Sequence, residues 1–276
     1  MSSSLSPTSH NLTLVIGDPI SHSLSPRMHN AAYSAAQLPF TMAAARVTRH
    51  GLQDAINGVR ALGIKGLAIT MPHKIALLEL LDSVDPLAQR IGAVNTVLNR
   101  DGQLFGFNTD WIGIVKPLER LTPLKGKQVA ILGAGGAALA AIFGCSEAGA
   151  SVTVFNRTLD KLDSLVARFG CKTGDLRDNE RIAASDIIIN TTSVGMGDLR
   201  NETPIPASTL SKHQIVFETI YSPHTTRLLH DAQQAGATVL RGFDMFLEQG
   251  AAQFEIHTST QAPRATMQEI LVQAAT

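Results

Sequence analysis

The feature that most constrains the fold is a glycine-rich segment, KQVAILGAGGAA, at residues 127–138. A short apolar run from Val129 to Leu132 leads into Gly133, and small residues then continue into a helical pattern. This order predicts a strand, a tight turn and the N-terminus of a helix, which is where the pyrophosphate of a dinucleotide binds. Gly133 would permit the turn, Gly135 would let the backbone approach the phosphates, and Ala138 would let the helix pack on the strand.

A second β-rich run, SVTVFN at residues 151–156, completes a strand–helix–strand unit. NAD-binding units usually carry an acidic residue at its end, for the ribose 2′-hydroxyl. Here the sequence is Asn156-Arg157-Thr158, with Lys161 one helical turn after Arg157. Because a guanidinium binds a 2′-phosphate that an acid would repel, this segment favours NADP over NAD. The alternative is that Arg157 and Lys161 are only solvated residues at the start of a helix, and the neighbouring Asp160 supports that alternative slightly.

The composition limits the class of protein. Its 276 residues suit two domains, and 23 basic residues balance 23 acidic ones, so nothing directs the chain to nucleic acid or an anionic membrane. Residues 1–11 lack the basic and apolar parts of a signal peptide, and we expect a frayed, Ser-rich tail there. Cys145 and Cys171 have no metal-binding spacing, which favours free thiols in the cytoplasm and no metal site.

The N-terminal half begins with an apolar strand, Leu12 to Ile16, that runs into a serine-rich loop. Ser25 followed by Pro26 predicts a helix start with Ser25 as the N-cap. Ser23 and Ser25 would then lie beside a helix N-terminus, which suits a carboxylate ligand. The alternative is a serine-rich turn with one capping serine.

Two further segments carry candidate side chains. The strand that ends at Thr70 is followed closely by Lys74, in the position where open α/β sheets bind ligands, although Lys74 could equally be a surface lysine at a helix start. The turn at residues 99–102 predicts a hairpin. Its second strand leads to Asp110, a candidate functional carboxylate. The alternative is that Asp110 only caps the following helix.

The rest of the C-terminal half reads as alternating helices and strands. We expect helices at Leu159–Phe169, residues 224–236 and residues 242–258, and strands at Asp186–Asn190, Ile215–Glu218 and Thr238–Leu240.

Taken together, the segments resemble the shikimate dehydrogenase family, including its quinate-using members. The resemblance runs from about Leu14 to Pro263 and rests on motifs in the family's order: GDPISHSLSPRMHN, ITMPHK, GAVNT, GFNTD, GAGGA, NRT, NTTSVGM, YSPHTTRLL and GFDMFLEQ. It implies an α/β protein with an N-terminal substrate domain (12–110 with 243–276) and a Rossmann-type NADP-binding domain (111–242). It also implies the NADP-linked interconversion of 3-dehydroshikimate and shikimate, in aromatic amino-acid (chorismate) biosynthesis.

The resemblance assigns roles to individual residues. Lys74 and Asp110 would be the catalytic pair, and the substrate would be bound by Ser23, Ser25, Thr70, Asn95, Tyr221 and Gln249. The cofactor would be bound by Gly133, Gly135, Gly136, Ala137, Asn156, Arg157, Thr158, Lys161, Thr192, Ser193 and Gly242. Elementary chemistry agrees, because ketone reduction builds an alkoxide that Lys74 could protonate while Asp110 orients the amine and holds the hydroxyl.

Three departures from the family pattern leave alternatives open. Ala68 stands where the family usually has Asn, Trp111 where glycine is common, and Glu218 in place of a frequent Asp. The loss of a polar group at Ala68 leaves a quinate or aminoshikimate dehydrogenase possible. A non-catalytic sensor of the pathway acid is a further alternative, but its signature would be loss of Lys74 or Asp110. The expected partner is a small-molecule substrate, and the oligomeric state stays open between monomer and homodimer.

Overall fold

The structure, a computed structural model, describes residues 10–275, without the side chains of Lys161 and Ala275. The described residues form two compact units. Unit 1 contains the described residues up to Pro86, then Val94–Phe107 and the residues from Gly250 onward, whereas unit 2 contains Leu87–Ala93 and Asn108–Gln249. Residues 87–93, 108–110 and 243–249, which the sequence assigns to the substrate domain, thus group with unit 2. Of the predicted tail, residues 1–9 lie outside the described part, and Asn11 already belongs to a strand.

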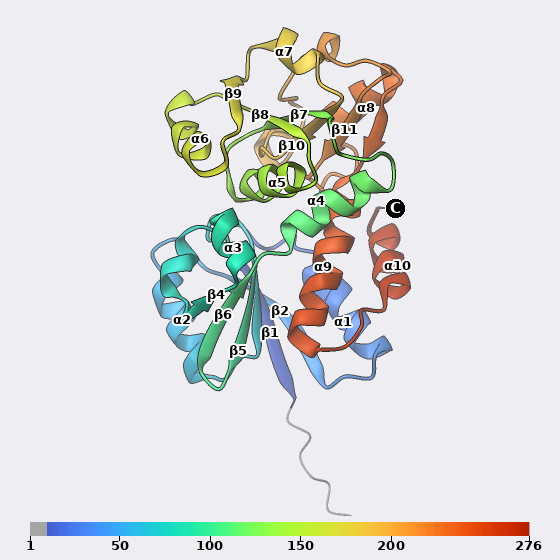
Figure 1. Cartoon of the computed structure of the whole chain (residues 1–276). Helices are drawn as coiled ribbons and strands as arrows, with labels where there is room; N and C mark the ends of the chain where they lie inside the picture. Colours follow the sequence, from blue (N-terminus) through green and yellow to red (C-terminus); the bar gives the residue numbers. More distant parts are fainter. Residues whose placement is uncertain (1–9, 276) are drawn as a thin grey trace, which may run out of the picture. The chain divides into compact units, whose positions relative to one another are not determined.

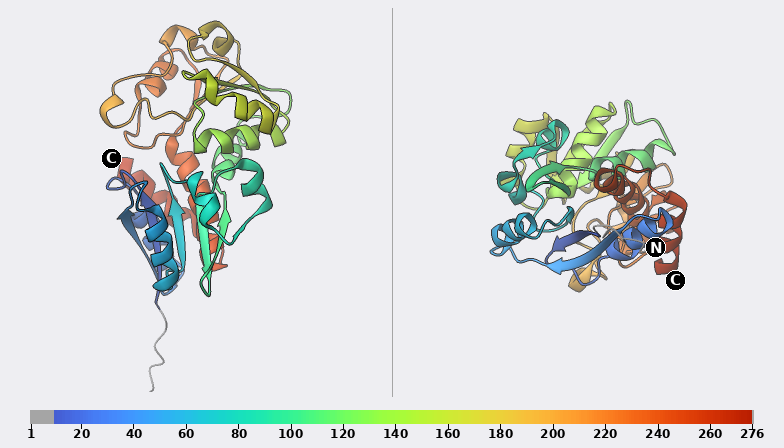
Figure 2. Two further views of the ribbon diagram at one scale, coloured as in Figure 1. Left: turned by 90° about the vertical axis from the view of Figure 1, so that its left-hand side faces the viewer. Right: turned by 90° about the horizontal axis from the view of Figure 1, so that it is seen from below.

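Unit 1 is built on a mixed six-stranded sheet of order β2-β1-β3-β5-β6-β4. Its strands are β1 (Asn11–Gly17), β2 (Phe40–Arg46), β3 (Gly66–Ile69), β4 (Ser83–Val84), β5 (Thr96–Arg100) and β6 (Gln103–Phe107). Its helices are α1 (Ser25–Ala35), α2 (Leu52–Ala61), the short 3-10 helix η1 (Ala76–Leu80), α10 (Arg264–Ala275) and the C-terminal part of α9 (Gly242–Thr258). Helix α2 lies on one side of this sheet, and α1, α9 and α10 lie on the other (Figures 1 and 2).

The core of unit 1 is centred on Tyr33 of α1, which is fully buried. Its ring lies 5.4 Å from that of Phe254 in α9 and 5.2 Å from that of Phe40 in β2. The predicted hairpin is confirmed: β5 and β6 pair in antiparallel fashion, and Asp101 and Gly102 have φ values of 52° and 86°. Two successive positive φ angles are those of a type I′ turn, which matches the twist of the paired strands.

Unit 2 has an all-parallel sheet of order β12-β11-β10-β7-β8-β9, the strand order of a Rossmann fold. Its strands are β7 (Gln128–Leu132), β8 (Ser151–Asn156), β9 (Lys172–Asp175), β10 (Ile187–Asn190), β11 (Ile215–Glu218) and β12 (Thr238–Leu240). Its helices are α3 (Pro86–Ile91, from Leu87 onward), α4 (Asp110–Glu119), α5 (Gly136–Glu147), α6 (Asp163–Phe169), α7 (Asn179–Ala183), α8 (Arg227–Gln234) and the start of α9, with 3-10 turns η2 (Leu159–Lys161), η3 (Gly197–Leu199) and η4 (Ala207–Thr209).

Both faces of this sheet are buried. Alternate residues of β7 belong to different cores: Val129 and Ile131 pack in one cluster, with α4, α5 and α6, whereas Ala130 and Leu132 pack in the other, with α7 and α8. Double burial explains why these strands are continuous apolar runs. One prediction was wrong here, because the expected helix Leu159–Phe169 is divided into η2 and α6.

Candidate functional site

The turn between β7 and α5 has the backbone that its glycines predict. Gly133 has a φ of +108°, and a Cβ atom there would lie 2.9 Å from the hydroxyl of Thr191 and 3.1 Å from the methyl of Thr192. Gly135 precedes α5, and a Cβ atom built on it would meet nothing within 4 Å. The turn thus leaves open space in front of a helix N-terminus, whose amide groups suit an anion.

The loop after β10 lies against this turn. The strand order reverses between β7 and β10, and ligands of open α/β sheets bind at such a switch point. Asn190 ends β10, and its side-chain oxygen accepts hydrogen bonds from the backbone N–H (3.0 Å) and the hydroxyl (2.7 Å) of Thr192. The structure therefore brings Gly133 and Thr192 together, with the exposed Ser193 next in the chain.

The NRT segment follows β8, the strand that pairs with β7 on its other side. Because parallel strands have their carboxyl ends at one edge, Asn156, Arg157 and Thr158 lie at the edge that carries the glycine turn. The Asn156 side chain donates to the carbonyl of Thr158 (2.7 Å), while Arg157 is exposed and makes no ion pair with a described residue. Lys161 ends η2, and its side chain lies outside the described part.

Four more predicted residues lie in unit 2. The ring of Tyr221 lies 4.7 Å from that of Phe246, and Gln249 donates to the carbonyl of Phe246 (3.1 Å). Gly242 has a packing role, since a Cβ atom there would lie 2.3 Å from the carbonyl oxygen of Ile220. Asp110, the fourth, begins α4 and is buried.

Unit 1 gathers the remaining predicted residues at one edge of its sheet. β1 and β3 are parallel, so the loop with Ser23 and Ser25 and the loop with Thr70 and Lys74 leave the sheet at the same edge. Strand β5 runs antiparallel to β3, which puts its first residues, just after Asn95, at that edge as well.

The two loops of this edge are held close together. The N–H of Asp18 donates to the carbonyl of Met71 (3.0 Å), and a Cβ atom on Gly17 would lie 2.4 Å from the methyl of Thr70. Asn95 is fixed by its backbone, whose carbonyl accepts from Ile69 N–H (2.7 Å) and from the Gln253 side chain (3.0 Å). Two hydroxyl-bearing loops, an amide and an amine thus share one edge.

The structure corrects one prediction about a helix cap, at Ser25, and gives a different N-cap position for the helix that begins at Asp110. Ser25 lies within the first turn of α1 and caps nothing; its N–H donates to the hydroxyl of Ser23 (3.3 Å). Asp110 is likewise the first helical residue of α4, and the side-chain oxygen of Asn108 accepts its N–H (3.0 Å). In both helices an acceptor stands two residues before the first helical residue, and the N-cap positions are Leu24 and Thr109 rather than Ser25 and Asp110.

One buried carboxyl group is perturbed. Burial raises the pKa of Glu218, at the end of β11, to about 7, while hydrogen bonds from Asn190, Ile220 and Thr226 act in the opposite sense. Sequence reasoning identified Glu218 only as a departure from the family pattern, and it did not single out Asn190. The positions of these two residues could have identified them, since both end neighbouring parallel strands at the switch-point edge.

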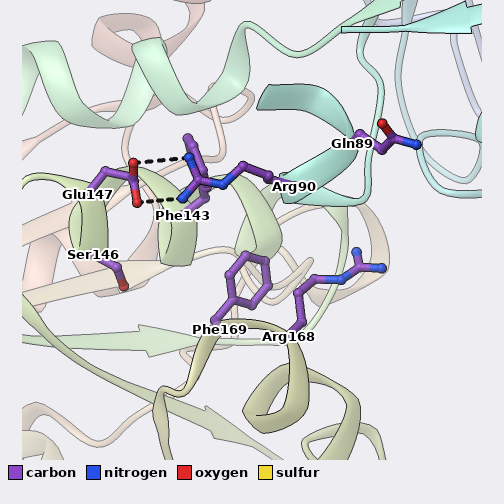
Figure 3. Close-up of a pocket in the computed structure, with 7 residues that line it drawn as sticks. All are labelled: Gln89, Arg90, Phe143, Ser146, Glu147, Arg168 and Phe169. Atoms are coloured by element: carbon purple, nitrogen blue, oxygen red, sulfur yellow. Dashed lines mark hydrogen bonds and ion pairs between the residues drawn. The ribbon is translucent and has the colours of Figure 1, made fainter. Parts of the chain in front are cut away.

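A separate pocket of about 370 Å³ lies within unit 2, at Gln89, Arg90, Phe143, Ser146, Glu147, Arg168 and Phe169 (Figure 3). Arg90 of α3 makes two hydrogen bonds to Glu147 of α5 (2.8 and 3.2 Å), and Arg168 donates to the carbonyl of Ile91 (3.2 Å). These contacts attach α3 to α5 and α6. No predicted site residue lines this pocket.

Residues 10–275 offer neither a metal centre nor a membrane span. The described residues contain no group of three or more His, Cys, Asp and Glu side chains that could hold a metal ion. Within the same part of the chain, no helix has both the length and the apolar character needed to cross a bilayer.

Family models and a curated relative match this chain along most of its length. Three family models match: the shikimate dehydrogenase substrate binding domain at residues 15–97, shikimate / quinate 5-dehydrogenase at 117–225, and the shikimate 5'-dehydrogenase C-terminal domain at 242–272. A shikimate dehydrogenase (NADP(+)) of Bacillus cereus (strain G9842) is 41% identical over 270 residues, which cover 94% of this chain and 96% of that protein.

Solved structures are similar too. Shikimate 5-dehydrogenase from Thermus thermophilus, in complex with NADP(H) and shikimate, is 37% identical with a TM-score of 0.88, covering 96% of this chain and 99% of that one. Quinate dehydrogenase from Corynebacterium glutamicum, in complex with NAD, is 29% identical with a TM-score of 0.86, covering 95% and 99%.

Proposed function

Because this chain belongs to the shikimate dehydrogenase family, as an NADP-dependent enzyme of it, we propose that it reduces 3-dehydroshikimate to shikimate with NADPH. The observation that carries the proposal is the edge of the unit 1 sheet, where the loops of Ser23, Thr70 and Lys74 converge. Hydroxyl groups and an amine suit a small acid with several hydroxyls.

The residues of unit 2 fit NADP. The open space before α5 would take the pyrophosphate, with Gly133, Gly135, Gly136 and Ala137 lining it. Arg157, exposed at the same edge, would bind the adenosine 2′-phosphate together with Asn156, Thr158 and Lys161. Thr192, Ser193 and Gly242 would line the nicotinamide side.

The chain's own groups would then manage charge and protons. NADPH, when bound, supplies the hydride that reduces the ketone carbon. The carbonyl oxygen gains negative charge as the carbon is reduced, and the ammonium of Lys74 would donate the proton that makes it a hydroxyl. Lys74 would recover a proton from solvent. Asp110 would accept a hydrogen bond from the substrate hydroxyl and favour the protonated amine.

The other binding residues would fix the substrate's orientation. Ser23 and Ser25 would donate to its carboxylate, and Tyr221 would lie near that group. Thr70, Asn95 and Gln249 would hold ring hydroxyls, each hydroxyl being able to donate and accept. We place the enzyme in the cytoplasm, in keeping with two free, buried thiols at Cys145 and Cys171.

Initial rates would test the proposal. The purified protein would be assayed with shikimate and with quinate, each with NADP and with NAD. We expect the highest initial rate with shikimate and NADP. Dominant quinate turnover would favour the quinate alternative, as in the Corynebacterium relative, and tight shikimate binding without turnover would favour the sensor.

A further inference from the structure

Glu218 ends β11 with a side chain that is completely buried and surrounded by hydrogen-bond donors. Both of its oxygens lie 3.0 Å from the side-chain nitrogen of Asn190. Oε1 also accepts from the backbone N–H of Ile220 (3.1 Å), and Oε2 accepts from the hydroxyl of Thr226 (3.0 Å). Since a buried carboxylate is stable only when its acceptors are satisfied, this arrangement fits the ionised form.

The carboxylate determines which way the Asn190 amide faces. Because a carboxylate only accepts, the nitrogen of Asn190 must face Glu218, and its oxygen must face the opposite way. That oxygen receives both the N–H and the hydroxyl of Thr192, at 3.0 and 2.7 Å. Thr192 in turn accepts the N–H of Val194 (3.1 Å). The orientation of one amide therefore sets the course of the loop at residues 190–194.

A second loop is fixed by the same carboxylate. The N–H of Ile220 is held by Glu218, and Tyr221 is the next residue. The backbone of Ile220 and Tyr221 lies against Gly242, which has no room for a side chain. Glu218 is thus the common acceptor for the loops that follow β10 and β11.

We propose that Glu218 is a positioning residue that holds Thr192 and Tyr221 in place for the nicotinamide half of NADP, acting through Asn190 and Ile220. The inference rests on the proposed function for the roles of Thr192 and Tyr221. It separates the cofactor site into two parts, since the glycine turn and Arg157 make no hydrogen bond to Glu218 among the described residues.

The test compares two ligands on the full chain. NADPH and adenosine 2′,5′-bisphosphate, which lacks the nicotinamide half, would be titrated by calorimetry into the wild type and Glu218→Gln. Both oxygens of Glu218 contact the side-chain nitrogen of Asn190, so in either orientation the nitrogen of the new glutamine would face that donor. The Asn190 amide should then turn over, so that its oxygen faces residue 218. We expect the Kd of NADPH to rise about tenfold or more, and the Kd of the bisphosphate to stay within about twofold.

Thr226→Val is the matched control. It removes one donor to Glu218 and the N-cap acceptor of Leu229, but it leaves the hydrogen bonds of Asn190 in place and keeps a methyl group beside Gly195. We expect a lower Tm with both Kd values within about twofold of the wild type. If Glu218→Gln does not fold, Asn190→Ser replaces it, with the same selective loss expected.

Equal weakening of both ligands, or no weakening of NADPH, would overturn the inference. A wild type that binds NADPH but does not oxidise shikimate would refute the proposed function and leave the ligand comparison valid. A wild type that oxidises shikimate, with NADPH binding unchanged in both Glu218→Gln and Asn190→Ser, would refute the positioning role alone.

Discussion

The candidate edges of the two sheets differ in what they are made of. At the unit 2 edge the main features are backbone: a positive φ at Gly133 and a helix N-terminus after Gly135. At the unit 1 edge they are side chains, among them Thr70, Lys74 and Asn95. A dinucleotide site can be built on backbone amides, whereas proton transfer needs a titratable side chain.

This difference predicts how each edge responds to mutation. Single side-chain replacements in unit 1 are expected to change the chemistry. At the edge of the unit 2 sheet that carries the glycine turn, they are expected to change which cofactor is bound, or how tightly, because the backbone amides proposed to bind phosphate remain. Asp110, at the start of α4, is the exception in unit 2, since its proposed role is in the chemistry.

The largest effect is expected at Lys74. Lys74→Ala removes the proposed proton donor, so kcat should fall by about 10²- to 10⁴-fold while the KM for shikimate stays within about tenfold. Lys65→Ala is the control and should keep kcat, because Lys65 lies just before β3, at the opposite end of that strand from Lys74. Steady-state kinetics measure both, and near-normal turnover in Lys74→Ala would exclude it as the donor.

The next largest effect is expected at the proposed 2′-phosphate site of unit 2. Replacing Arg157 and Lys161 by Ala should lower kcat/KM for NADP by about 10- to 100-fold, because the 2′-phosphate loses its charged partners. The value for NAD should change about twofold at most. Arg177→Ala, an exposed arginine paired with Asp175 after β9, serves as the control. Equal losses with both cofactors would reject the assignment.

The units should also respond to pH in opposite directions. In unit 1, burial lowers the pKa of His29 to about 3 and that of His257 to about 4, so both are neutral when folded. Unfolding lets them bind protons below about pH 6.5, and each should cost up to about 1.4 kcal/mol of stability per pH unit as the pH falls. In unit 2, the pKa of Glu218 is raised from 4.5 to about 7, so the folded chain holds this proton more tightly than the unfolded chain does. The stability of unit 2 should therefore fall as the pH rises from about 4.5 to about 7.

Urea unfolding between pH 5 and 8, combined with hydrogen exchange to separate the units, would measure these slopes. His29→Gln should flatten the acid side in unit 1, and His50→Gln, an exposed residue, should not. A slope unaffected by His29→Gln would contradict this account.

The smallest effect is expected at Ala68. It is buried in β3, opposite Thr96 of β5. Ala68→Asn would restore the polar group of the family pattern, and one net hydrogen bond is worth about 0.5–1.5 kcal/mol. The KM for shikimate should therefore fall by about two- to tenfold. The ratio of shikimate to quinate turnover reports the change, and a constant ratio would show that Ala68 does not set preference.

Local patterns predicted much of both units. The glycine turn, the hairpin at Asp101-Gly102 and the apolar strands follow from backbone freedom and burial, which a sequence displays directly. Leu162, between η2 and α6, packs in the core cluster of Val129 and Ile131, and the two-residue strand β4 pairs with β6. Local patterns do not show these contacts, because the partners are distant in the chain. The cap at Ser25 was misassigned for a different reason, since Ser23 offers the same chemistry two residues earlier.

Residue roles were harder to predict than the fold. Serine, lysine and aspartate are common at helix starts, so Ser25, Lys74 and Asp110 gained their proposed roles from resemblance rather than from spacing. Glu218 could not be evaluated from sequence at all, because its donors come from the ends of two strands and from a helix start.

The boundary between the units has a consequence for how such proteins can evolve. Unit 1 is assembled from three separate stretches of chain, and α9 belongs to unit 2 up to Gln249 and to unit 1 from Gly250. A single crossover between two genes therefore cannot exchange one complete unit for another. Replacement of the cofactor-binding half would require recombination at several points at once, one of them inside a continuous helix, so new cofactor preferences are reached more readily by point mutation.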